Sequence, residues 1–368
     1  MESGTGTANA TTQRVWRVTP FDPSDLPALG LYFKHQLSDA RQYGSMGLFQ
    51  WRAVDNYVTP GIINLIKDET RIVATLSCTP KRLVVKGQGC PVAEIGDAYT
   101  DPAYQRQGML TLLIRQSTQD ALAKGISGVY STPSTLTPSL PAFINKAGFL
   151  PQQDVKIRNL VFPLDIGPQV ERRTHWLVGR YASSLFLTFV YGYYRARKLM
   201  NRQRSSVTIE EVRDLPEGWD AFWDQSKQAY DVLFERSRRA LTWRFFENPN
   251  KYKFYVAKRG DTIIGYMVCR VVADEDIKRF VIADFLFAPG CEGYFTVLLL
   301  RAFEEALRLG AHSISSWCLE RSTWDTQLKS FGFTPRSDIV LVWFQNEFAA
   351  GLGAGNRWHF TVSDSDNI

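Results

Sequence analysis

One short segment combines a turn, a glycine and a basic residue in a way that could bind an anion. The segment Gln105-Arg106-Gln107-Gly108-Met109-Leu110 lies between a β-rich run and an amphipathic stretch that predicts a helix. A glycine-bearing turn at a helix N-terminus presents several unpaired backbone N–H groups, and these groups bind phosphate together with the helix dipole. Arg106 adds a charge that can reach the same anion. The segment therefore predicts a phosphate-binding turn; the alternative is an ordinary strand–helix turn with a solvated arginine.

Matching residues show that the chain contains an internal repeat. The clearest pairs are Trp51-Arg52 with Trp243-Arg244, Ile95-Gly96-Asp97 with Ile282-Ala283-Asp284, and Gly148-Phe149 with Gly332-Phe333. The pairs occur in the same order in both copies, and their separation shrinks slightly along the chain, as small deletions would cause. Ordered self-similarity of this kind indicates one fold copied twice.

Both copies predict the same order of elements. Two helical stretches come first, at 25–35 and 47–54 in the first copy and at 219–233 and 238–246 in the second. Three β-rich runs follow, and then an amphipathic helix at 109–123 or 295–308. A strand, a short helix that ends at Gly-Phe and a final strand close each copy. Strand clusters that alternate with helices predict a mixed α/β layer architecture.

The repeat also predicts the domain boundaries. We expect a flexible leader at 1–14, a catalytic domain at 15–168, a linker helix with a basic cluster at 169–206, a degenerate second domain at 207–348 and a docked C-terminal tail at 349–368. The tail is expected to dock because a disordered tail would seldom carry Trp358-His359-Phe360.

The turn around Gly108 resembles the signature of the GNAT acyltransferases, Gln/Arg-x-x-Gly-x-Gly/Ala, although Leu110 occupies the last position. The closing segment from Asn145 to Phe149 is similar to a later helix-and-strand element of that superfamily. The resemblance covers about 15–163 and is weaker in the second copy. It implies an α/β fold with a mixed sheet (α+β), two tandem GNAT-like domains of which the second is degenerate, and an N-acyltransferase that uses acyl-CoA and no metal.

The resemblance also assigns residues to CoA. The loop backbone would bind the pyrophosphate, and the preceding strand would pair with the pantetheine arm like an extra strand. The implied CoA-binding residues are Tyr99, Thr100, Arg106, Gln107, Gly108, Met109, Leu110, Thr111 and Asn145. In the second copy the corresponding loop contains Glu292, which would repel a phosphate, and has no arginine in place of Arg106. We therefore expect one CoA site per chain.

Two carboxylates could accept the proton of an attacking amine, namely Glu94 and Asp97. The segment that holds Glu94 is similar to the general-base strand of the superfamily's histone acetyltransferases. Strand alternation would place the two carboxylates on opposite faces. Asp97 recurs as Asp284 in the copy without a CoA signature, which favours a structural role, whereas Glu94 becomes Val281. Glu94 is therefore the preferred base and Asp97 the alternative; a histidine or the substrate itself could also take the proton.

Other residues are candidates for the acceptor pocket, namely His35, Tyr130, Trp358 and His359. His35 falls in the early helical region that borders the acceptor in this fold, and Trp358 and His359 in the tail could stack on a sugar or base. His35, Trp358 and His359 could equally be packing or surface residues. The tyrosine that often serves as general acid is replaced by Ile144, so Tyr130, Tyr99, a nearby serine or water would protonate the thiolate.

The acceptor itself is implied only by a looser resemblance. The Leu48-Phe49-Gln50-Trp51 start and the Trp-His-Phe-Thr…Asp-Ser-Asp end are similar to bacterial N-acyltransferases of surface-polysaccharide pathways. That resemblance implies transfer of an acetyl or short hydroxyacyl group, such as 3-hydroxybutyryl, to an amino-sugar nucleotide, such as a dTDP-linked amino deoxyhexose. The alternatives are an N-acyl amino acid synthase fed by acyl carrier protein and a non-catalytic acyl-CoA-sensing module.

Composition excludes several other classes of protein. The net charge of +6 is largely due to one cluster at 195–204, so the chain is not a broadly basic nucleic-acid binder. Five scattered cysteines and four histidines predict neither a disulfide framework nor a zinc site, and the polar N-terminus is not a signal peptide, which favours the cytoplasm. The apolar stretch at 176–194 either packs its aromatic face on a domain or, with the basic cluster, makes a peripheral membrane contact through 176–204 at the inner membrane face.

Overall fold

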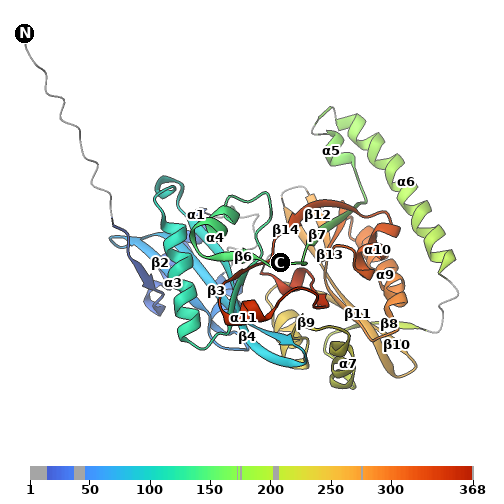
Figure 1. The fold of residues 1–368 in the computed structure, drawn as a ribbon. Helices are drawn as coiled ribbons and strands as arrows, with labels where there is room; N and C mark the ends of the chain where they lie inside the picture. Colours follow the sequence, from blue (N-terminus) through green and yellow to red (C-terminus); the bar gives the residue numbers. More distant parts are fainter. Residues whose placement is uncertain are drawn as a thin grey trace, which may run out of the picture.

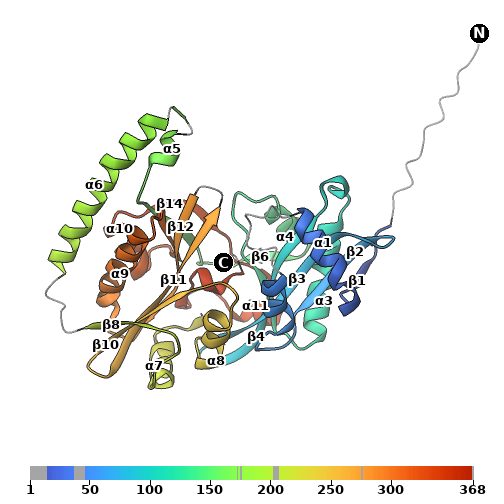
Figure 2. The same cartoon turned by 180° about the vertical axis from the view of Figure 1, so that it is seen from behind.

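The computed structural model describes residues 15–36, 46–171, 173–174, 176–201, 207–274 and 277–366. Within these ranges the chain forms two mixed sheets, each covered by helices on both faces (Figures 1 and 2). The expected α/β architecture is confirmed.

The first sheet is built around a long antiparallel core. Its strand order is β1 (Val18–Pro20), β2 (Ile62–Asp68), β3 (Arg71–Val85), β4 (Gln88–Thr100), β5 (Gly128–Ser131), β15 (Val342–Phe344) and β6 (Phe149–Pro151). Two further strands extend it: β9 (Val232–Phe234) pairs with β3, and β16 (Trp358–His359) pairs with β9. The pair β4–β5 is parallel, and its register covers only Val92–Glu94 against Gly128–Tyr130. Beyond that point the two strands separate.

The second sheet repeats this plan. Its strand order is β14 (Thr334–Ile339), β7 (Ile157–Pro163), β13 (Ser313–Leu319), β12 (Ile277–Phe287), β11 (Thr262–Asp274), β10 (Lys253–Arg259) and β8 (Thr208–Val212). The parallel pair β12–β13 covers only 279–282 against 313–316. Both copies therefore contain a wedge where the two central parallel strands separate.

The two copies exchange their closing strands. The strand β7 follows the first copy along the chain but lies between β13 and β14 of the second sheet, and β15 follows the second copy but lies between β5 and β6 of the first. The expectation that a final strand closes its own copy is therefore wrong, because each final strand finds its hydrogen-bonding partners in the other sheet. The exchange ties the two sheets together.

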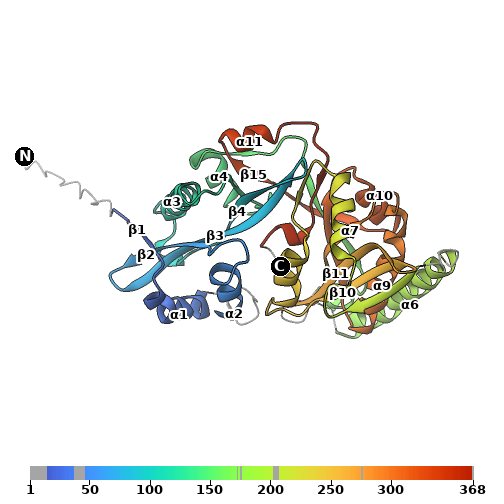
Figure 3. The same cartoon turned by 90° about the horizontal axis from the view of Figure 1, so that it is seen from below.

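Helices cover both faces of each sheet (Figure 3). In the first domain α3 (Met109–Ala123) and α4 (Leu140–Lys146) pack on one face, while α1 (Leu26–Gln36) and α2 (Met46–Phe49) pack on the other. In the second domain α9 (Phe295–Arg308) and α10 (Thr323–Ser330) oppose α7 (Trp219–Ser226) and α8 (Arg238–Leu241). The remaining helices are α5 (Gly167–Glu171), α6 (Trp176–Met200) and α11 (Glu347–Gly351).

Two predicted helices differ from the structure. The helix expected at 219–233 ends at Ser226, and its last predicted residues form β9, because Val232–Phe234 pairs with β3 on one side and with β16 on the other. The stretch at 47–54 becomes α2 followed by a π-helical turn over Gln50–Val54, and the second copy has the same turn at Thr242–Phe246. These paired turns hold the repeated Trp-Arg residues.

Candidate active site

The predicted phosphate loop lies at the N-terminus of α3. Gly108 is the N-cap residue with φ of 81° and Arg106 has φ of 64°, so both take left-handed conformations that turn the chain sharply into the helix. No side chain of the described residues caps α3. The first backbone N–H groups of a helix have no intrahelical acceptor, so this end is open to an anion. Gln107, whose amide oxygen accepts from the Trp16 indole at 3.0 Å, is exposed beside the exposed Arg106.

Leu110, where the signature has a smaller residue, has a packing role. Its side chain is partly buried against the apolar core of the first domain, beside the fully buried Leu113. The larger side chain at this position is thus accommodated by the core of the first domain.

The equivalent loop of the second copy is closed on itself. The Glu292 carboxylate accepts the Gly290 N–H at 3.1 Å, and the Gln327 amide donates to the Glu292 carbonyl at 3.0 Å. The second-copy loop thus carries a carboxylate that bonds within the loop, whereas the first-copy loop carries Arg106.

Asp97 lies at a bulge in β4. The register between β3 and β4 shifts at this point, and Asp97 has φ of 46°. Asp97 forms an ion pair with the buried Arg52 and accepts a hydrogen bond from Ser77 at 2.9 Å. A β-bulge redirects side chains, so the simple alternation that would place Glu94 and Asp97 on opposite faces does not hold. Both carboxylates are linked to Asp366: Glu94 accepts its N–H, and Arg52, the partner of Asp97, contacts its carbonyl.

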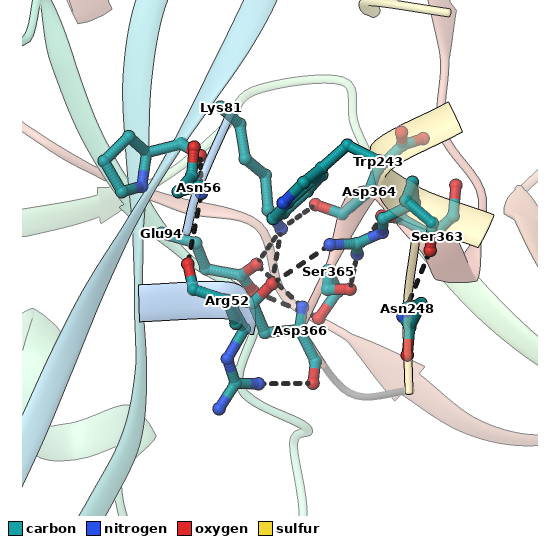
Figure 4. Close-up of polar contacts among 12 residues, drawn as sticks. Arg52, Asn56, Lys81, Glu94, Trp243, Asn248, Ser363, Asp364, Ser365 and Asp366 are labelled. Carbon is teal, nitrogen blue, oxygen red and sulfur yellow. Dashed lines mark hydrogen bonds and ion pairs between the residues drawn. The ribbon is translucent and has the colours of Figure 1, made fainter. Parts of the chain in front are cut away.

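Glu94 is 2% exposed and accepts several hydrogen bonds (Figure 4). One oxygen accepts from Thr132 at 2.7 Å and from Ser365 at 3.0 Å. The other accepts from Lys81 Nζ at 2.5 Å and from the Asp366 N–H at 2.8 Å. Burial raises the pKa of Glu94 above its usual value, although the neighbouring Lys81 charge opposes this shift. A raised pKa makes a carboxylate a stronger base.

The last described residues of the chain, Trp358–Asp366, form a buried segment between the two domains that we call the tail. Their exposed fractions do not exceed 8%. In the second domain, Arg236 Nη2 lies 2.9 Å from both Asp284 and Asp364, and Arg244 donates to the Ser365 carbonyl at 2.6 Å. The tail is thus bonded to buried charges of the second copy.

The first domain contacts the other side of the tail (Figure 4). Lys81 Nζ lies 3.0 Å from Asp366 Oδ1 and donates to the Asp364 carbonyl at 3.0 Å, and Tyr130 donates to the same carbonyl at 2.7 Å. Burial alone would raise the pKa of Asp366, but Lys81 and the neighbouring arginines hold it well below its usual value. Asp366 is therefore an ionised carboxylate that neutralises cations from both copies.

The other residues predicted to bind CoA or the acceptor differ in burial and in the element that carries them. Tyr99 is half-buried against the cluster of α1 and α2, Thr100 ends β4, and Asn145 is exposed near the end of α4. Met109 is 2% exposed in the core, and Thr111 lies in the first turn of α3. His35 belongs to α1, but its side chain lies outside the described residues.

Trp358 and His359 lie in the tail, on the side of the second domain. They help to line a cavity of about 480 Å³ together with Tyr230 and Trp324. His359 Nε2 contacts the Phe285 carbonyl at 2.9 Å, and burial lowers the pKa of His359 to about 3. His359 is therefore a neutral packing residue near pH 7, and it is not adjacent to Glu94. Burial, followed by the Glu94 charge, raises the pKa of Tyr130 well above its usual value, which makes this tyrosine a poor acid.

Sequence reasoning missed the buried cations. Arg52 and Arg244 were visible only as a repeated Trp-Arg pair, and nothing in the sequence indicated that Lys81 and Arg236 would contact the tail. The repeated Trp-Arg pair was the one sequence signal for these cations. Arg52 and Arg244 each contact the tail residue Asp366 from equivalent turns of the two copies. Among the described residues, no group of three or more His, Cys, Asp or Glu side chains is arranged to hold a metal ion.

Comparison with known proteins identifies both copies. A family model described as an acetyltransferase (GNAT) domain matches residues 31–150, and one described as an acetyltransferase (GNAT) family matches residues 216–333. No curated protein matches the sequence.

Solved structures share the whole two-domain fold at low sequence identity. A tandem GNAT protein of the clavulanic acid biosynthesis pathway has 12% identity and a TM-score of 0.59, with 89% of this chain and 98% of that chain covered. N-Myristoyltransferase of Saccharomyces cerevisiae with bound myristoyl-CoA has 12% identity and a TM-score of 0.59, with 93% and 85% covered. A probable N-acyltransferase of Enterococcus faecalis has 11% identity and a TM-score of 0.57, with 90% and 72% covered. With a GNAT match in each half and a fold shared over its length, the chain belongs to the GNAT superfamily as a tandem N-acyltransferase.

Proposed function

We propose that the first copy binds acyl-CoA and that the second copy does not. The observation that carries this proposal is the contrast between the two loops. Neither α3 nor α9 has a side-chain cap among the described residues, but the loop before α3 carries Arg106, whereas the loop before α9 carries Glu292, which accepts the Gly290 N–H. An uncapped helix end attracts phosphate, and a carboxylate repels it.

The tail supports the same assignment. In the second copy the tail runs along β12 beyond the point where β12 leaves β13, and His359 contacts the Phe285 carbonyl there. This is the wedge in which a pantetheine arm would pair with the strand. In the first copy the equivalent stretch of β4, with Tyr99 and Thr100, is the proposed pantetheine strand. The loop backbone from Arg106 to Thr111 is the proposed pyrophosphate site, and Asn145 is a further proposed CoA contact.

We propose Glu94 as the base that accepts the proton of the attacking amine. The wedge between β4 and β5 opens directly after Glu94, and burial makes its carboxylate more basic. The tail covers this carboxylate through Ser365 and Asp366, so an amine or a relaying water reaches it only when the end of the tail shifts. Asp97 is more exposed, with a side-chain exposed fraction of 18%, but it is committed to Arg52. It remains the second candidate.

The proposed acceptor is the amino group of a nucleotide-linked amino sugar, most simply a dTDP-linked amino deoxyhexose of a surface-polysaccharide pathway. The proposed acyl group is acetyl or a short hydroxyacyl such as 3-hydroxybutyryl. Support comes from the sequence resemblance of the Leu48–Trp51 segment and of the Trp358–Asp366 tail. Separately, we propose a peripheral membrane contact through 176–204.

The experiment reverses the charge of one exposed arginine in each copy, Arg106 before α3 and Arg321 in the turn between β13 and α10. Arg106→Glu should weaken CoA binding in calorimetry at least tenfold, because a charge-assisted hydrogen bond contributes about 1.5–3 kcal/mol. Arg321→Glu is the matched control, since Arg321 is also an exposed arginine with φ of 63° but lies in the second copy. Equal CoA affinity in the two variants would refute the assignment of the site. Amine-dependent thiol release from acetyl-CoA or 3-hydroxybutyryl-CoA with dTDP-amino sugars tests the acceptor separately.

A further inference from the structure

The helix α6 presents a continuous apolar stripe to solvent. Of the sixteen exposed large hydrophobic side chains among the described residues, nine belong to this one helix. They are Trp176, Leu177, Val178, Tyr181, Leu185, Phe189, Tyr191, Leu199 and Met200. Tyr181 and Leu185 each expose 74% of their surface. Single exposed apolar residues are ordinary, but an apolar patch of this length on one element marks an interaction site.

The stripe is not the face by which α6 packs on its own domain. Leu177, Tyr181, Leu185 and Phe189 follow one another at intervals of four residues, which places them on one side of the helix. The opposite side carries the buried Val190 and the aromatic side chains that pack against the core of the second domain. Figures 1 and 3 show α6 on the outer side of that domain, away from the first domain. The helix is therefore anchored by one face and free on the other.

The position of α6 is fixed by close contact with α5. A Cβ at Gly179 would lie 2.8 Å from Glu171 Cβ, and a Cβ at Gly167 would lie 2.7 Å from Ser183 Cβ. Ser183 also donates to Asp165 at 2.9 Å. Side chains larger than glycine would separate the two helices. This close packing against α5 fixes which face of α6 is buried, and therefore which face carries the exposed stripe.

The charges of α6 all have the same sign. The helix contains four basic residues, Arg180, Arg195, Arg197 and Lys198, and no acidic residue. Arg180 lies over the Trp176 ring with 5.7 Å between its guanidinium carbon and the ring centroid. Arg180 and Arg195 are exposed, while Arg197 donates to the Ser330 carbonyl and Lys198 lies near Glu304. On a helical projection, Arg180 and Arg195 flank one side of the apolar stripe.

We propose that α6 lies flat on an anionic lipid bilayer, with the stripe in the interface and the flanking arginines on lipid phosphates. An apolar face with Trp, Tyr and Phe beside basic residues is the composition of a surface-lying helix. Among the described residues, no helix is long and apolar enough to cross a membrane. A helix of 25 residues is about 37 Å long, which gives a stripe that a flat surface can cover along its whole length.

A bilayer fits the stripe better than a second copy of the chain does. A two-fold dimer through α6 would bring the same exposed face of both chains together. The two sets of Arg180 and Arg195 would then approach one another with no acidic residue on α6 to neutralise them. Anionic lipids provide that neutralisation. The inference does not depend on which amine the enzyme acylates.

The test is co-sedimentation of the full-length protein with phosphatidylcholine vesicles, with and without phosphatidylserine. Wild-type protein should bind the anionic vesicles, and added salt should weaken the binding. Leu185→Asp combined with Phe189→Asp should lower the partition coefficient at least tenfold, because each side chain loses its apolar burial. Leu150→Asp is the matched control, since Leu150 is also half exposed but lies on β6. Arg195→Gln should weaken binding to anionic vesicles and leave neutral vesicles unaffected.

Three results would overturn the proposal. The first is the absence of wild-type binding to either kind of vesicle. The second is equal binding by the wild type and by the Leu185→Asp, Phe189→Asp variant, with unchanged circular dichroism and melting temperature. The third is a concentration-dependent dimer of the wild type that this variant converts to a monomer without any vesicle binding, which would assign the stripe to a second copy.

Discussion

Replacing Glu94 with glutamine separates its chemical role from its structural role. Glutamine keeps the shape of the side chain but has no negative charge and cannot accept a proton. The four groups that donate hydrogen bonds to Glu94 can keep part of their bonding to glutamine. Its amide oxygen can accept from Lys81 and from the Asp366 N–H, and its amide nitrogen can face Thr132 and Ser365, whose hydroxyl groups can rotate to accept. Local geometry should therefore survive.

The loss of stability follows from the charges that remain. Removing one partner of a buried ion pair costs about 3–5 kcal/mol when the other charge is left alone. Lys81 is not left alone, because Asp366 Oδ1 lies 3.0 Å from its Nζ. The loss then approaches that of a weakened charge-assisted hydrogen bond, about 1–3 kcal/mol. Urea unfolding of Glu94→Gln should show a lower midpoint with an unchanged slope.

Turnover should fall far more than stability does. Loss of a general base reduces kcat by about 10²–10⁴-fold. Affinity for CoA should stay the same, because the loop before α3 makes no hydrogen bond with Glu94 among the described residues. Thr132→Val is the control, since it removes one hydrogen bond to Glu94 but retains the carboxylate. A folded Glu94→Gln variant with kcat within about twofold of the wild type would refute Glu94 as the base and leave it as an anchor for the tail.

Three further predictions concern the buried groups around the tail. The folded-state pKa of His359, about 3, lies below the unfolded value of about 6.5. The free energy of unfolding should therefore fall by about 2 kcal/mol when the pH is lowered from above 6.5 to 5. Urea titrations at several pH values should show a smaller loss for His359→Gln. Arg236→Met leaves two buried carboxylates without their shared cation and should cost about 3–5 kcal/mol or release the tail to proteolysis, whereas a loss below about 1 kcal/mol would contradict the ion-pair reasoning. Trp243→Ala removes the ring stacked on Trp51 at a centroid distance of 4.3 Å and should lower the free energy of unfolding by about 3–5 kcal/mol in chemical denaturation. An unfolding midpoint equal to that of the wild type would contradict this prediction.

The local features of the first copy could be predicted from sequence because they depend on nearby residues. A glycine with positive φ followed by an amphipathic run is a local signal, and Gly108 begins α3 as this signal predicts. The repeat predicted that both copies would have the same order of elements, since two copies of one sequence pattern must satisfy the same packing.

The placement of the tail could not be predicted in the same way. Its contacts with Glu94 join residues more than 270 positions apart. No periodicity or turn signal reports such a contact. The exchange of β7 and β15 is hidden for the same reason, because a strand that completes a neighbouring sheet has the same pattern as one that completes its own. The bulge at Asp97 also broke the alternation that strand periodicity implies.

Contacts with the tail explain why the second copy keeps Arg244 and Asp284. A copy that has lost its anion loop would be free to lose Arg244 and Asp284 as well, if their only role were chemistry. Both contact the tail instead: Arg244 donates to the Ser365 carbonyl, and Asp284 accepts from Thr361 at 2.8 Å. The end of that tail then covers the carboxylate proposed as the base of the other copy. The second copy therefore holds in place the segment that covers Glu94.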